Sequence, residues 1–377
     1  MHVGVVSTEF PPSLGGVETY AWEYSKELVR RGHEVTVFTA PQADGLAELP
    51  GARVLPLLRR RRKHDRNVLR QHRVDVWHVM NAGYAWLALD LPEPVIASVH
   101  GNDFLRPYVL AARLDLFNHW RPLRSFFEPL DIKLGIYRSA RLMRKAFRKV
   151  RHILANSHFT ERVFLEHFPD CQGKTSTAWV GVANEFFSIE HIPGQGDAPR
   201  LLTISRLSEP RKNVALVLHA LSALKGRYPF SYTVVGDGLE RMALENLAHS
   251  LDLADRVRFC GSVDNGELRQ HLAQCDLFVL TASINAYSHE GFGIVYLEAN
   301  AAGVPVLAAR LAGAAEAVAE NVSGYFVEEP SVADIAAALE AFLAGRRQFQ
   351  AAACRDFARQ FHWARVVEQA EKYYDVR

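Results

Sequence analysis

Short runs of β-branched and other apolar residues alternate along the chain with stretches whose composition suits helices. The apolar runs of the first half are HVGVVST, EVTVFTA, VDVWHV and PVIASVH, and those of the second half are LLTIS, YTVVGDG, RVRFCG, DLFVLT and VPVLAA. Strands of a parallel sheet covered on both faces give such runs, because both of their sides are buried. The pattern therefore predicts an α/β fold with doubly wound parallel sheets.

The alternation is interrupted at residues 184–200, a stretch that contains Pro and Gly and is typical of a linker. A chain of 377 residues is also long enough for two domains with separate cores. We predict two Rossmann-like domains, at residues 1–190 and 191–355. The last segment, residues 356–377, has apolar residues every three or four positions and is predicted to form one amphipathic helix.

Charge is distributed unevenly along the chain. The formal net charge is only +2, but residues 1–190 carry 26 Lys/Arg against 20 Asp/Glu, and the second half has an acidic excess. Four scattered cysteines suit reduced, buried thiols better than a zinc site or a disulfide framework. The N-terminus enters an apolar strand directly, and no apolar run approaches the roughly 20 residues of a membrane span. These features indicate a cytoplasmic protein.

In open α/β sheets, ligands bind beyond the carboxyl ends of the strands, so the loops that follow strands are searched first. Gly15 and Gly16 follow the first strand and precede a helix, where backbone N–H groups can bind an anion. The alternative is an ordinary turn before a helix. Neither a dinucleotide fingerprint nor a P-loop follows any predicted strand, which argues against a dehydrogenase or a P-loop enzyme.

Three cations follow the strand LLTIS in the sequence RLSEPRKN. They are Arg206, Arg211 and Lys212. Arg can bridge two phosphate oxygens and Lys supplies a compact charge, so the set suits a diphosphate. The alternative is a solvated basic turn.

Two carboxylates flank a Gly-Phe-Gly turn in EGFGIVYLE. Glu290 precedes the turn, and Glu298 lies two turns into the helix that follows. Eight positions span at most about 12 Å along a helix axis, which is too far for an acid/base pair acting on one bond. The spacing suits two ends of a nucleotide sugar, with backbone N–H groups of Gly291–Ile294 between them.

The motifs EFPPSLGGVE, ANSHFT, SRLSEPRKN and EGFGIVYLE follow one another across nearly the whole chain. Together they resemble the retaining glycosyltransferases of family 4. The resemblance implies the GT-B fold, in which two facing Rossmann-like, doubly wound domains form an interdomain cleft. It also implies that the helix 356–377 packs back on the N-terminal, acceptor-side domain, with Trp363 in the family's aromatic position. The C-terminal domain would then bind the nucleotide sugar.

The resemblance also implies roles for individual residues. Glu298 would hold the ribose, while Glu290 and the backbone of Gly291, Phe292, Gly293 and Ile294 would hold the sugar and phosphates. Arg206 and Lys212 would hold the diphosphate. Arg211 is an alternative to Lys212, because the family spaces its Arg and Lys by five residues. Asn213 after Lys212 matches the family and favours the lysine. His100, in SVHGND, matches a histidine near the transferred sugar.

The activity implied by the resemblance is transfer of a hexosyl group from a nucleoside-diphosphate sugar to a hydroxyl acceptor, with retention of anomeric configuration. The acceptor can be a glycan, a lipid-linked sugar or a small molecule. The fixed cations take the place of a metal ion, so neither a metal nor another cofactor is expected. Three alternatives remain open: a nucleotide-sugar epimerase, a glycosyl phosphorylase, and a non-catalytic nucleotide-sugar-binding subunit.

A basic region extends over residues 104–151, with 12 Lys/Arg and three Asp/Glu. Within it, helical spacing sets Ile136, Ala140, Met143, Phe147 and Val150 on one face. One interpretation is peripheral contact with an anionic membrane at the inner face of the cell membrane. The other interpretations are a site for a charged acceptor, and an apolar stripe that packs on the domain while the charges are solvated. Nucleic acid is not expected, since no recognition motif accompanies the charge.

Overall fold

The structure, a computed structural model, describes residues 1–12, 15–42, 45–105, 124–192 and 198–374. The chain divides into two compact units, one formed by Met1–Gly181 with Trp363–Arg377 and the other by Val182–His362. The division after Gly181 differs from the boundary at residue 190 that the sequence predicts. The Pro/Gly-containing stretch begins with a 3-10 turn, Asn184–Ser188, whose Phe186 is buried. This turn packs against helix α10 (Ile294–Ala301) of the second unit.

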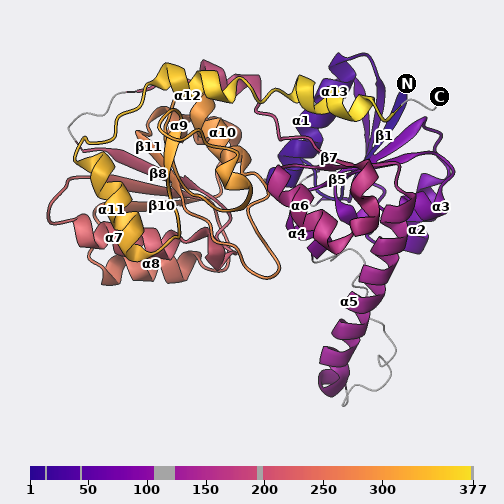
Figure 1. Cartoon of the computed structure of the whole chain (residues 1–377), viewed down its shortest axis with the longest axis horizontal. Coiled ribbons are helices and arrows are strands. Elements are labelled where there is room, and N and C mark those ends of the chain that lie inside the picture. The colour runs from indigo at the N-terminus through magenta and orange to yellow at the C-terminus, as the bar shows by residue number, and fades with distance from the viewer. Residues whose placement is uncertain (13–14, 43–44, 106–123, 193–197, 375–377) are drawn as a thin grey trace. The chain divides into compact units, whose positions relative to one another are not determined.

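The first unit contains a seven-stranded sheet of order β3-β2-β1-β4-β5-β6-β7, in which all strand pairs are parallel (Figure 1). Its strands are β1 (His2–Val6), β2 (Glu34–Phe38), β3 (Ala52–Leu55), β4 (Val76–Val79), β5 (Val95–Val99), β6 (His152–Ala155) and β7 (Thr175–Thr177). Its helices are α1 (Gly16–Arg30), α2 (Arg62–Leu69), α3 (Leu87–Asp90), α4 (Asn102–Leu105), α5 (Arg124–Lys149), α6 (His158–His167) and α13 (Trp363–Glu371).

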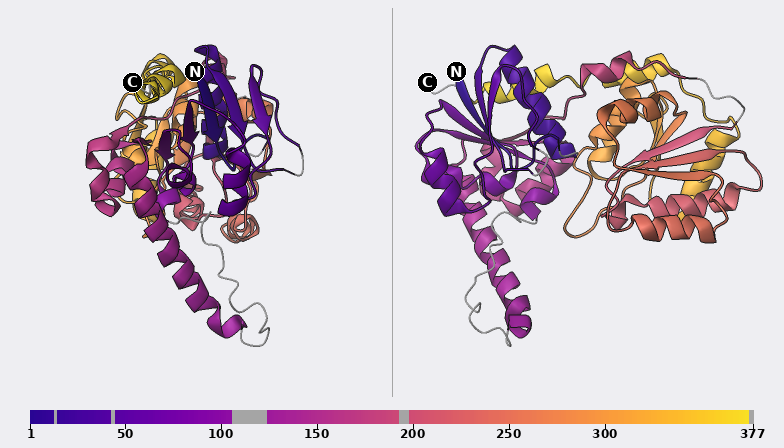
Figure 2. Two further views of the ribbon diagram at one scale, coloured as in Figure 1. Left: turned by 90° about the vertical axis from the view of Figure 1, so that its right-hand side faces the viewer. Right: turned by 180° about the vertical axis from the view of Figure 1, so that it is seen from behind.

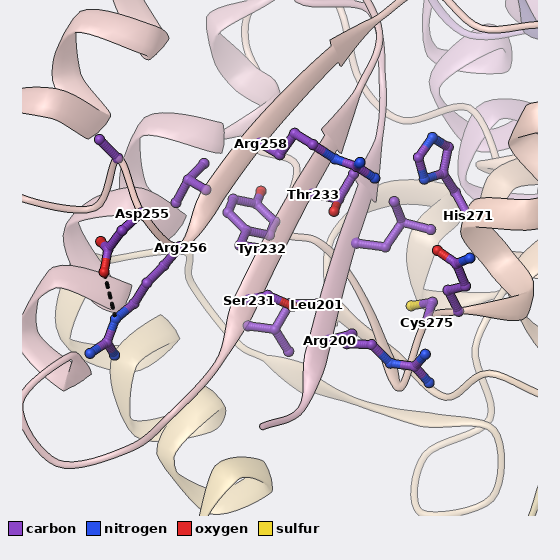
Figure 3. A pocket seen from close by; sticks show the side chains of 14 residues that line it. Arg200, Leu201, Ser231, Tyr232, Thr233, Asp255, Arg256, Arg258, His271 and Cys275 are labelled. Atoms are coloured by element: carbon purple, nitrogen blue, oxygen red, sulfur yellow. Dashed lines mark ion pairs between the residues drawn. The ribbon is translucent and has the colours of Figure 1, made fainter. Parts of the chain in front are cut away.

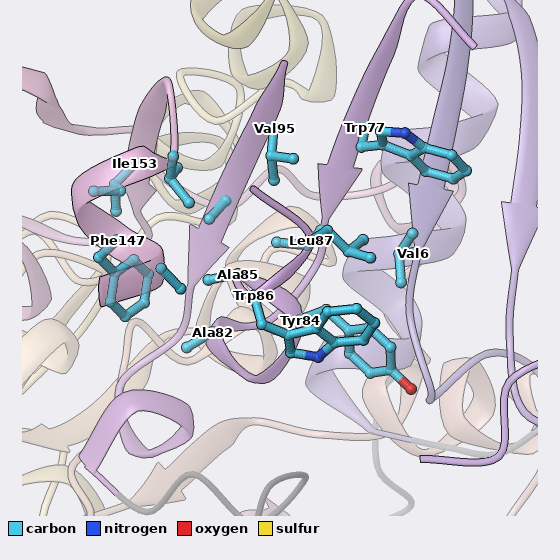
Figure 4. Close-up of a cluster of buried hydrophobic side chains, with 14 of the residues drawn as sticks. Val6, Trp77, Ala82, Tyr84, Ala85, Trp86, Leu87, Val95, Phe147 and Ile153 are labelled. Atoms are coloured by element: carbon cyan, nitrogen blue, oxygen red, sulfur yellow. The ribbon is translucent and has the colours of Figure 1, made fainter. Parts of the chain in front are cut away.

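The core of the first unit lies between the sheet and the helices that cover it. Every residue of β4 and β5 is buried, including the polar His78 and Ser98 that interrupt their apolar runs. Large side chains fill the space beside these strands, among them Trp77, Tyr84, Trp86 and Phe147 (Figure 4). A side chain at Gly4 would place its Cβ 2.6 Å from the Trp77 ring, so the glycine in β1 makes room for the indole.

The second unit contains a six-stranded parallel sheet of order β10-β9-β8-β11-β12-β13. Its strands are β8 (Arg200–Ile204), β9 (Ser231–Val235), β10 (Val257–Gly261), β11 (Leu277–Leu280), β12 (Val306–Ala309) and β13 (Gly324–Val327). The remaining helices are α7 (Val214–Leu224), α8 (Arg241–Ser250), α9 (Asn265–Ala273), α11 (Val332–Leu343) and α12 (Ala351–Ala358). Figure 1 shows α7, α8 and α11 on one face of this sheet and α9, α10 and α12 on the other.

The C-terminal segment forms two helices, α12 and α13, where the sequence predicts a single helix over 356–377. The break falls at residues 359–362, because the carbonyl of Phe361 accepts a hydrogen bond from the Val182 backbone N–H at 3.0 Å. Helix α12 belongs to the second unit and α13 packs on α1 of the first. Trp363 is the first residue of α13 and is buried.

Helix α5 is long and extends beyond the sheet of its unit in both views of Figure 2. Residues 106–123 of the basic region 104–151 lie outside the described residues, and side chains of α5 are described from Tyr137 onward. From there, Met143, Phe147 and Val150 are buried as predicted, but Ala140 is exposed and Ser139 takes its place on the buried face. The apolar stripe therefore packs on the first unit.

Among the described residues, no helix combines the length and apolar character needed to cross a membrane. The four cysteines are free thiols, and Cys171, Cys275 and Cys354 are buried. Cys260 differs from the expectation of buried thiols, because it lies half-buried in β10, at an edge of the sheet.

Candidate functional site

In the sheet of the second unit, β8 and β11 are neighbours at the centre. The strands that follow β8 in sequence lie on one side of this pair, and those that follow β11 lie on the other, so the strand order reverses between β8 and β11. Loops that follow two such strands diverge, and ligands of open α/β sheets bind at this point. The loop after β8 carries Arg206–Lys212, and the loop after β11 carries Glu290. The structure thus brings the predicted cations and the first predicted carboxylate together at the carboxyl edge of the sheet.

Hydrogen bonds join these two loops. Asn213 follows the 3-10 turn Pro210–Lys212 in the left-handed conformation, with φ of 59°. Its side-chain amide donates to the Thr281 carbonyl at 2.5 Å and to Ser283 Oγ at 2.7 Å. Ser283 in turn donates its backbone N–H to the Arg211 carbonyl at 2.7 Å. The turn that carries the cations is therefore fixed to the loop that carries Glu290.

Glu290 is the centre of a buried charge cluster. Its Oε2 lies 2.7 Å from Lys212 Nζ and 3.3 Å from an Arg211 guanidinium nitrogen. Burial opposes ionisation of this carboxyl, but Lys212 and Arg211 outweigh it and lower the pKa of Glu290 to about 2. Arg211 also donates to Ser288 Oγ at 2.9 Å. Both candidate cations thus contact one carboxylate, which is ionised at neutral pH.

Arg206 is placed differently from the other two cations. Its side chain is 63% exposed and pairs with Glu209 at 3.1 Å. Glu209 also contacts Arg211 at 2.6 Å, so one carboxylate connects the exposed and the buried arginine. Arg206 can leave such an exposed pair at little cost, because surface ion pairs contribute at most about 1 kcal/mol.

Helix α10 begins directly after the Gly-Phe-Gly turn. Gly293 precedes its first residue with φ of 89°, a conformation that favours glycine. The Tyr296 N–H donates to the Gly293 carbonyl at 3.0 Å, whereas the N–H groups of Ile294 and Val295 precede the first bond of the helix. Phe292 is buried against Phe361, which holds the turn from behind. Glu298 is buried in the second turn of α10, as the apolar neighbours of this residue in the sequence suggest.

Gly313 supports the same turn from the loop after β12. Its N–H donates to the Glu290 carbonyl at 3.0 Å, and a Cβ at this position would lie 1.9 Å from the Gly291 carbonyl oxygen. We expect Gly313→Ala to displace the turn and weaken the nucleotide-sugar binding that the sequence predicts here at least tenfold, because backbone atoms cannot move aside as a side chain can. Isothermal titration measures this. Gly226→Ala, in the same unit, is the control, since its Cβ would meet no atom within 4 Å and its backbone is not in the left-handed conformation.

His100 follows β5 in the first unit. Its backbone N–H donates to Asp103 Oδ1 at 3.0 Å, and its ring packs edge-on against Tyr20 with 4.5 Å between centroids. Burial lowers the pKa of His100 to about 4, so the ring is neutral at pH 7. The ring forms a hydrogen bond with the Met80 backbone, and Nε2 is buried without a partner in the described structure. Nε2 is therefore an acceptor nitrogen.

Gly15 and Gly16 lie at the start of α1, after β1 in the first unit. Gly15 is the residue before the helix, and its extended backbone is open to any residue type. A Cβ at Gly16 would meet no atom within 4 Å, so the backbone there is accessible. Both glycines follow β1, and the strand order of this sheet reverses between β1 and β4. They therefore lie at the kind of place where ligands of open α/β sheets bind.

A pocket of about 470 Å³ lies elsewhere in the second unit, near the amino ends of β8, β9 and β10 (Figure 3). Two of its three arginines have partners within the unit. Arg200 forms a two-pronged pair with Asp276, and Arg256 donates to the carbonyls of Lys225 and Tyr228. This pocket is at the opposite end of the strands from Glu290 and is not the place where the predicted residues gather.

Sequence reasoning missed several residues that hold the site. Glu209 and Ser288 fix the cations, Gly313 supports the turn, and Asp103 accepts the backbone N–H groups of His100 and Ala82. For Asn213, which is identified in the sequence only by its match to the family, the missed part is the pair of hydrogen bonds to the loop after β11. Asn before a helix does carry a signal, since Asn tolerates the left-handed conformation. Gly313 carries none, because its importance depends on a backbone segment more than 20 residues away in the sequence.

Two family models match the chain. Residues 14–182 match "Glycosyltransferase Family 4" and residues 187–361 match "Glycosyl transferases group 1". The chain is 30% identical over 385 residues to a GDP-mannose-dependent alpha-(1-6)-phosphatidylinositol monomannoside mannosyltransferase of Mycolicibacterium smegmatis, covering 96% of this chain and 93% of that one. It is 29% identical over 413 residues to a D-inositol 3-phosphate glycosyltransferase of Geodermatophilus obscurus, covering 96% and 84%.

Solved structures with the same fold include the sucrose-phosphate synthase from Thermosynechococcus elongatus, with a TM-score of 0.76, 17% identity and coverage of 99% and 98%. Another is WaaG, a glycosyltransferase involved in lipopolysaccharide biosynthesis, with a TM-score of 0.71, 19% identity and complete coverage of both chains. The two parallel sheets are those of the GT-B fold, and the protein is a glycosyltransferase. The chain belongs to family 4 of these enzymes, and this membership is consistent with transfer with retention.

Proposed function

We propose that this enzyme transfers a mannosyl group from GDP-mannose to an inositol-containing phospholipid that already carries mannose. The observation that supports this best is the match over nearly the full length to relatives named for that donor and acceptor. Relatives named for D-inositol 3-phosphate share an inositol phosphate in the acceptor. The second candidate acceptor is therefore a free inositol phosphate.

The donor would bind at the carboxyl edge of the second unit. Lys212 and Arg206 would hold the diphosphate, and Glu298 the ribose hydroxyls. Lys212 can contact Glu290 and a phosphate together, because an ammonium group has three N–H donors. The backbone of Gly291–Ile294 would add N–H groups toward the phosphates, and Gly15 and Gly16 would offer accessible backbone from the first unit.

Glu290 would hold hydroxyls of the transferred sugar. Its pKa of about 2 keeps it ionised, and therefore an acceptor, at neutral pH. His100 would accept a hydrogen bond from a sugar hydroxyl through Nε2. A ring with a pKa of about 4 is a weak base at pH 7, so this role is positioning rather than proton removal.

The reaction would proceed by front-face transfer with retention. The bond between the anomeric carbon and the diphosphate oxygen breaks, and a bond from that carbon to the acceptor oxygen forms. The acceptor proton passes to the leaving diphosphate, whose growing negative charge is stabilised by Arg206, Lys212 and the start of α10. No metal ion or other cofactor is needed in this scheme. An inverted product in a proton NMR spectrum of the anomeric region would contradict it.

The donor is tested by thermal unfolding with GDP-, UDP-, ADP- and dTDP-sugars. At 100 times its Kd, GDP-mannose should stabilise the wild type by about 2.7 kcal/mol. Glu298→Ala should lose this response, because the ribose hydroxyls lose their acceptor. Glu328→Ala, an exposed carboxylate, is the control. If another nucleotide sugar raises the melting temperature more than GDP-mannose does, that nucleotide sugar is the donor instead.

The acceptor is tested by incubating the enzyme with GDP-mannose and either a mannosylated phosphatidylinositol or D-inositol 3-phosphate. Mass spectrometry of the products distinguishes the two. Transfer to the lipid alone supports the first proposal, and transfer to the free phosphate alone supports the second. Release of mannose in both mixtures without transfer would contradict both.

We also propose that the first unit contacts anionic lipid at the cytoplasmic face of the membrane. The apolar stripe of α5 packs on the first unit, and basic side chains of the helix are exposed, among them Arg138, Arg141, Arg144, Lys145 and Lys149. Each basic residue near an anionic surface contributes about 1 kcal/mol to binding.

Reversal of three of these charges, Arg138→Glu, Arg141→Glu and Arg144→Glu, should lower binding to vesicles of phosphatidylglycerol and phosphatidylcholine at least 100-fold. Vesicle sedimentation at low salt measures this. Three reversals on the second unit, at Arg258, Arg346 and Arg359, are the matched control. Equal binding to vesicles of phosphatidylcholine alone would exclude an electrostatic contact.

A further inference from the structure

Five buried side chains of the first unit form one continuous hydrogen-bonded chain. Tyr24 Oη lies 2.7 Å from Tyr374 Oη, which lies 2.6 Å from His78 Nδ1. His78 Nε2 lies 2.9 Å from Ser98 Oγ, which lies 3.2 Å from Tyr20 Oη. All five residues are at most 2% exposed. The chain connects the C-terminal turn with α1, β4 and β5.

His78 gives this chain a single direction. Burial, together with the nearby His100, lowers the pKa of His78 to about 3, so its ring is neutral. A neutral imidazole donates through one nitrogen and accepts through the other. The hydroxyl groups on its two sides must therefore point the same way along the chain, and one of them cannot turn alone without leaving a buried polar group unpaired.

The chain ends at Tyr20, whose ring touches His100. The two rings meet edge-on with centroids 4.5 Å apart, and on another side Tyr20 meets the indole of Trp363 at 5.3 Å. The Tyr20 ring also stacks on the Tyr24 ring, with 5.6 Å between their centroids. Tyr20 is thus anchored at its hydroxyl by Ser98 and at its faces by aromatic rings.

We propose that Tyr20 is a positioning residue for the transfer reaction, which holds the His100 ring so that Nε2 faces the substrate. The inference rests on the proposed role of His100. The hydrogen-bonded chain fixes Tyr20, so the C-terminal segment acts on His100 through Tyr374 and Trp363. Tyr20 itself touches no reacting atom.

The test compares Tyr20→Met with Tyr24→Met in the full-length protein. Both changes remove a buried aromatic ring from the same face of α1, but only Tyr20 touches His100. NMR of histidine-labelled protein, with His100→Gln used for assignment, reports the pKa and the tautomer of His100 without any ligand. We expect Tyr20→Met to raise the pKa of His100 from about 4 by more than one unit, because water reaches the ring. Tyr24→Met, which reaches His100 only through Tyr20, should raise it by much less.

Tyr20→Phe keeps the ring but releases it from Ser98, so an intermediate shift is expected. Tyr20→Phe also tests the proposal if Tyr20→Met does not fold. With GDP-mannose as donor, kcat of Tyr20→Met should fall about tenfold while the donor KM stays within twofold. An unchanged His100 spectrum in both Tyr20 variants overturns the proposal. If the His100 spectrum shifts in the Tyr20 variants but the wild-type enzyme shows no transfer, the proposed function is overturned instead.

Discussion

Replacing Lys212 with Ala should lower kcat/KM for the nucleotide sugar by about 100- to 1000-fold. The ammonium group is fixed 2.7 Å from Glu290 at the edge where the diphosphate would leave, and loss of one fixed group that stabilises transition-state charge has effects of this size. Steady-state kinetics with radiolabelled donor measure the change. Most of it should appear in kcat, because the charge on the diphosphate grows as its bond breaks.

Arg211→Ala decides which of the two cations holds the phosphate. If Lys212 holds the phosphate, Arg211→Ala should reduce activity much less than Lys212→Ala does. The remaining effect would come mainly from the lost Arg211 contacts to Glu290 and Ser288. Lys225→Ala is the control for loss of a lysine in an ion pair outside the site. A Lys212→Ala enzyme with activity within threefold of wild type would remove Lys212 from the proposed mechanism.

Replacing Glu290 with Gln should lower the melting temperature of the second unit by about 10 °C. The change leaves two buried cations without their shared carboxylate, and breaking a buried pair in this way costs about 3–5 kcal/mol. Differential scanning calorimetry at pH 7 gives the shift. Glu320→Gln, which breaks an exposed pair with Arg310, should shift the melting temperature by only a few degrees.

The pH dependence of this difference has a definite sign. The pKa of Glu290 is about 2 in the folded protein and near 4.5 when unfolded, so its stabilisation is full above pH 4.5 and is lost as pH falls toward 2. Its total is about 3 kcal/mol. The gap in melting temperature between wild type and Glu290→Gln should therefore narrow below pH 4.5. A gap that stays constant down to pH 3 would show that the loss in Glu290→Gln is not electrostatic.

Much of the fold follows from the sequence because both sheets are buried on both faces. Strands such as Leu277–Leu280 have no polar side that must face water, so each appears as an uninterrupted apolar run. The break between α12 and α13 could not be predicted in this way. Both helices keep apolar spacing, and the interruption depends on a backbone bond from Val182, 179 residues from its partner Phe361.

The site was predictable to the extent that its residues follow strands. Arg206, Lys212 and Glu290 come after β8 and β11, which are neighbours at the reversal of strand order. The pairing of Lys212 and Arg211 with the same carboxylate was not predictable, because spacing gives no distance across a turn. The roles assigned to these residues stay predictions until donor binding and kinetics are measured.

The return of α13 to the first unit has a consequence for biosynthesis. Tyr374 lies 350 residues after Tyr24, yet their hydroxyl groups form a hydrogen bond in one core. At about 5–20 residues per second, synthesis of residues 182–362 alone takes roughly 10–40 seconds. Throughout this time the nascent first unit lacks the segment that covers α1. The second unit can thus finish folding first, although its sequence emerges later, and the first unit is complete only after residues 363–374 have left the ribosome.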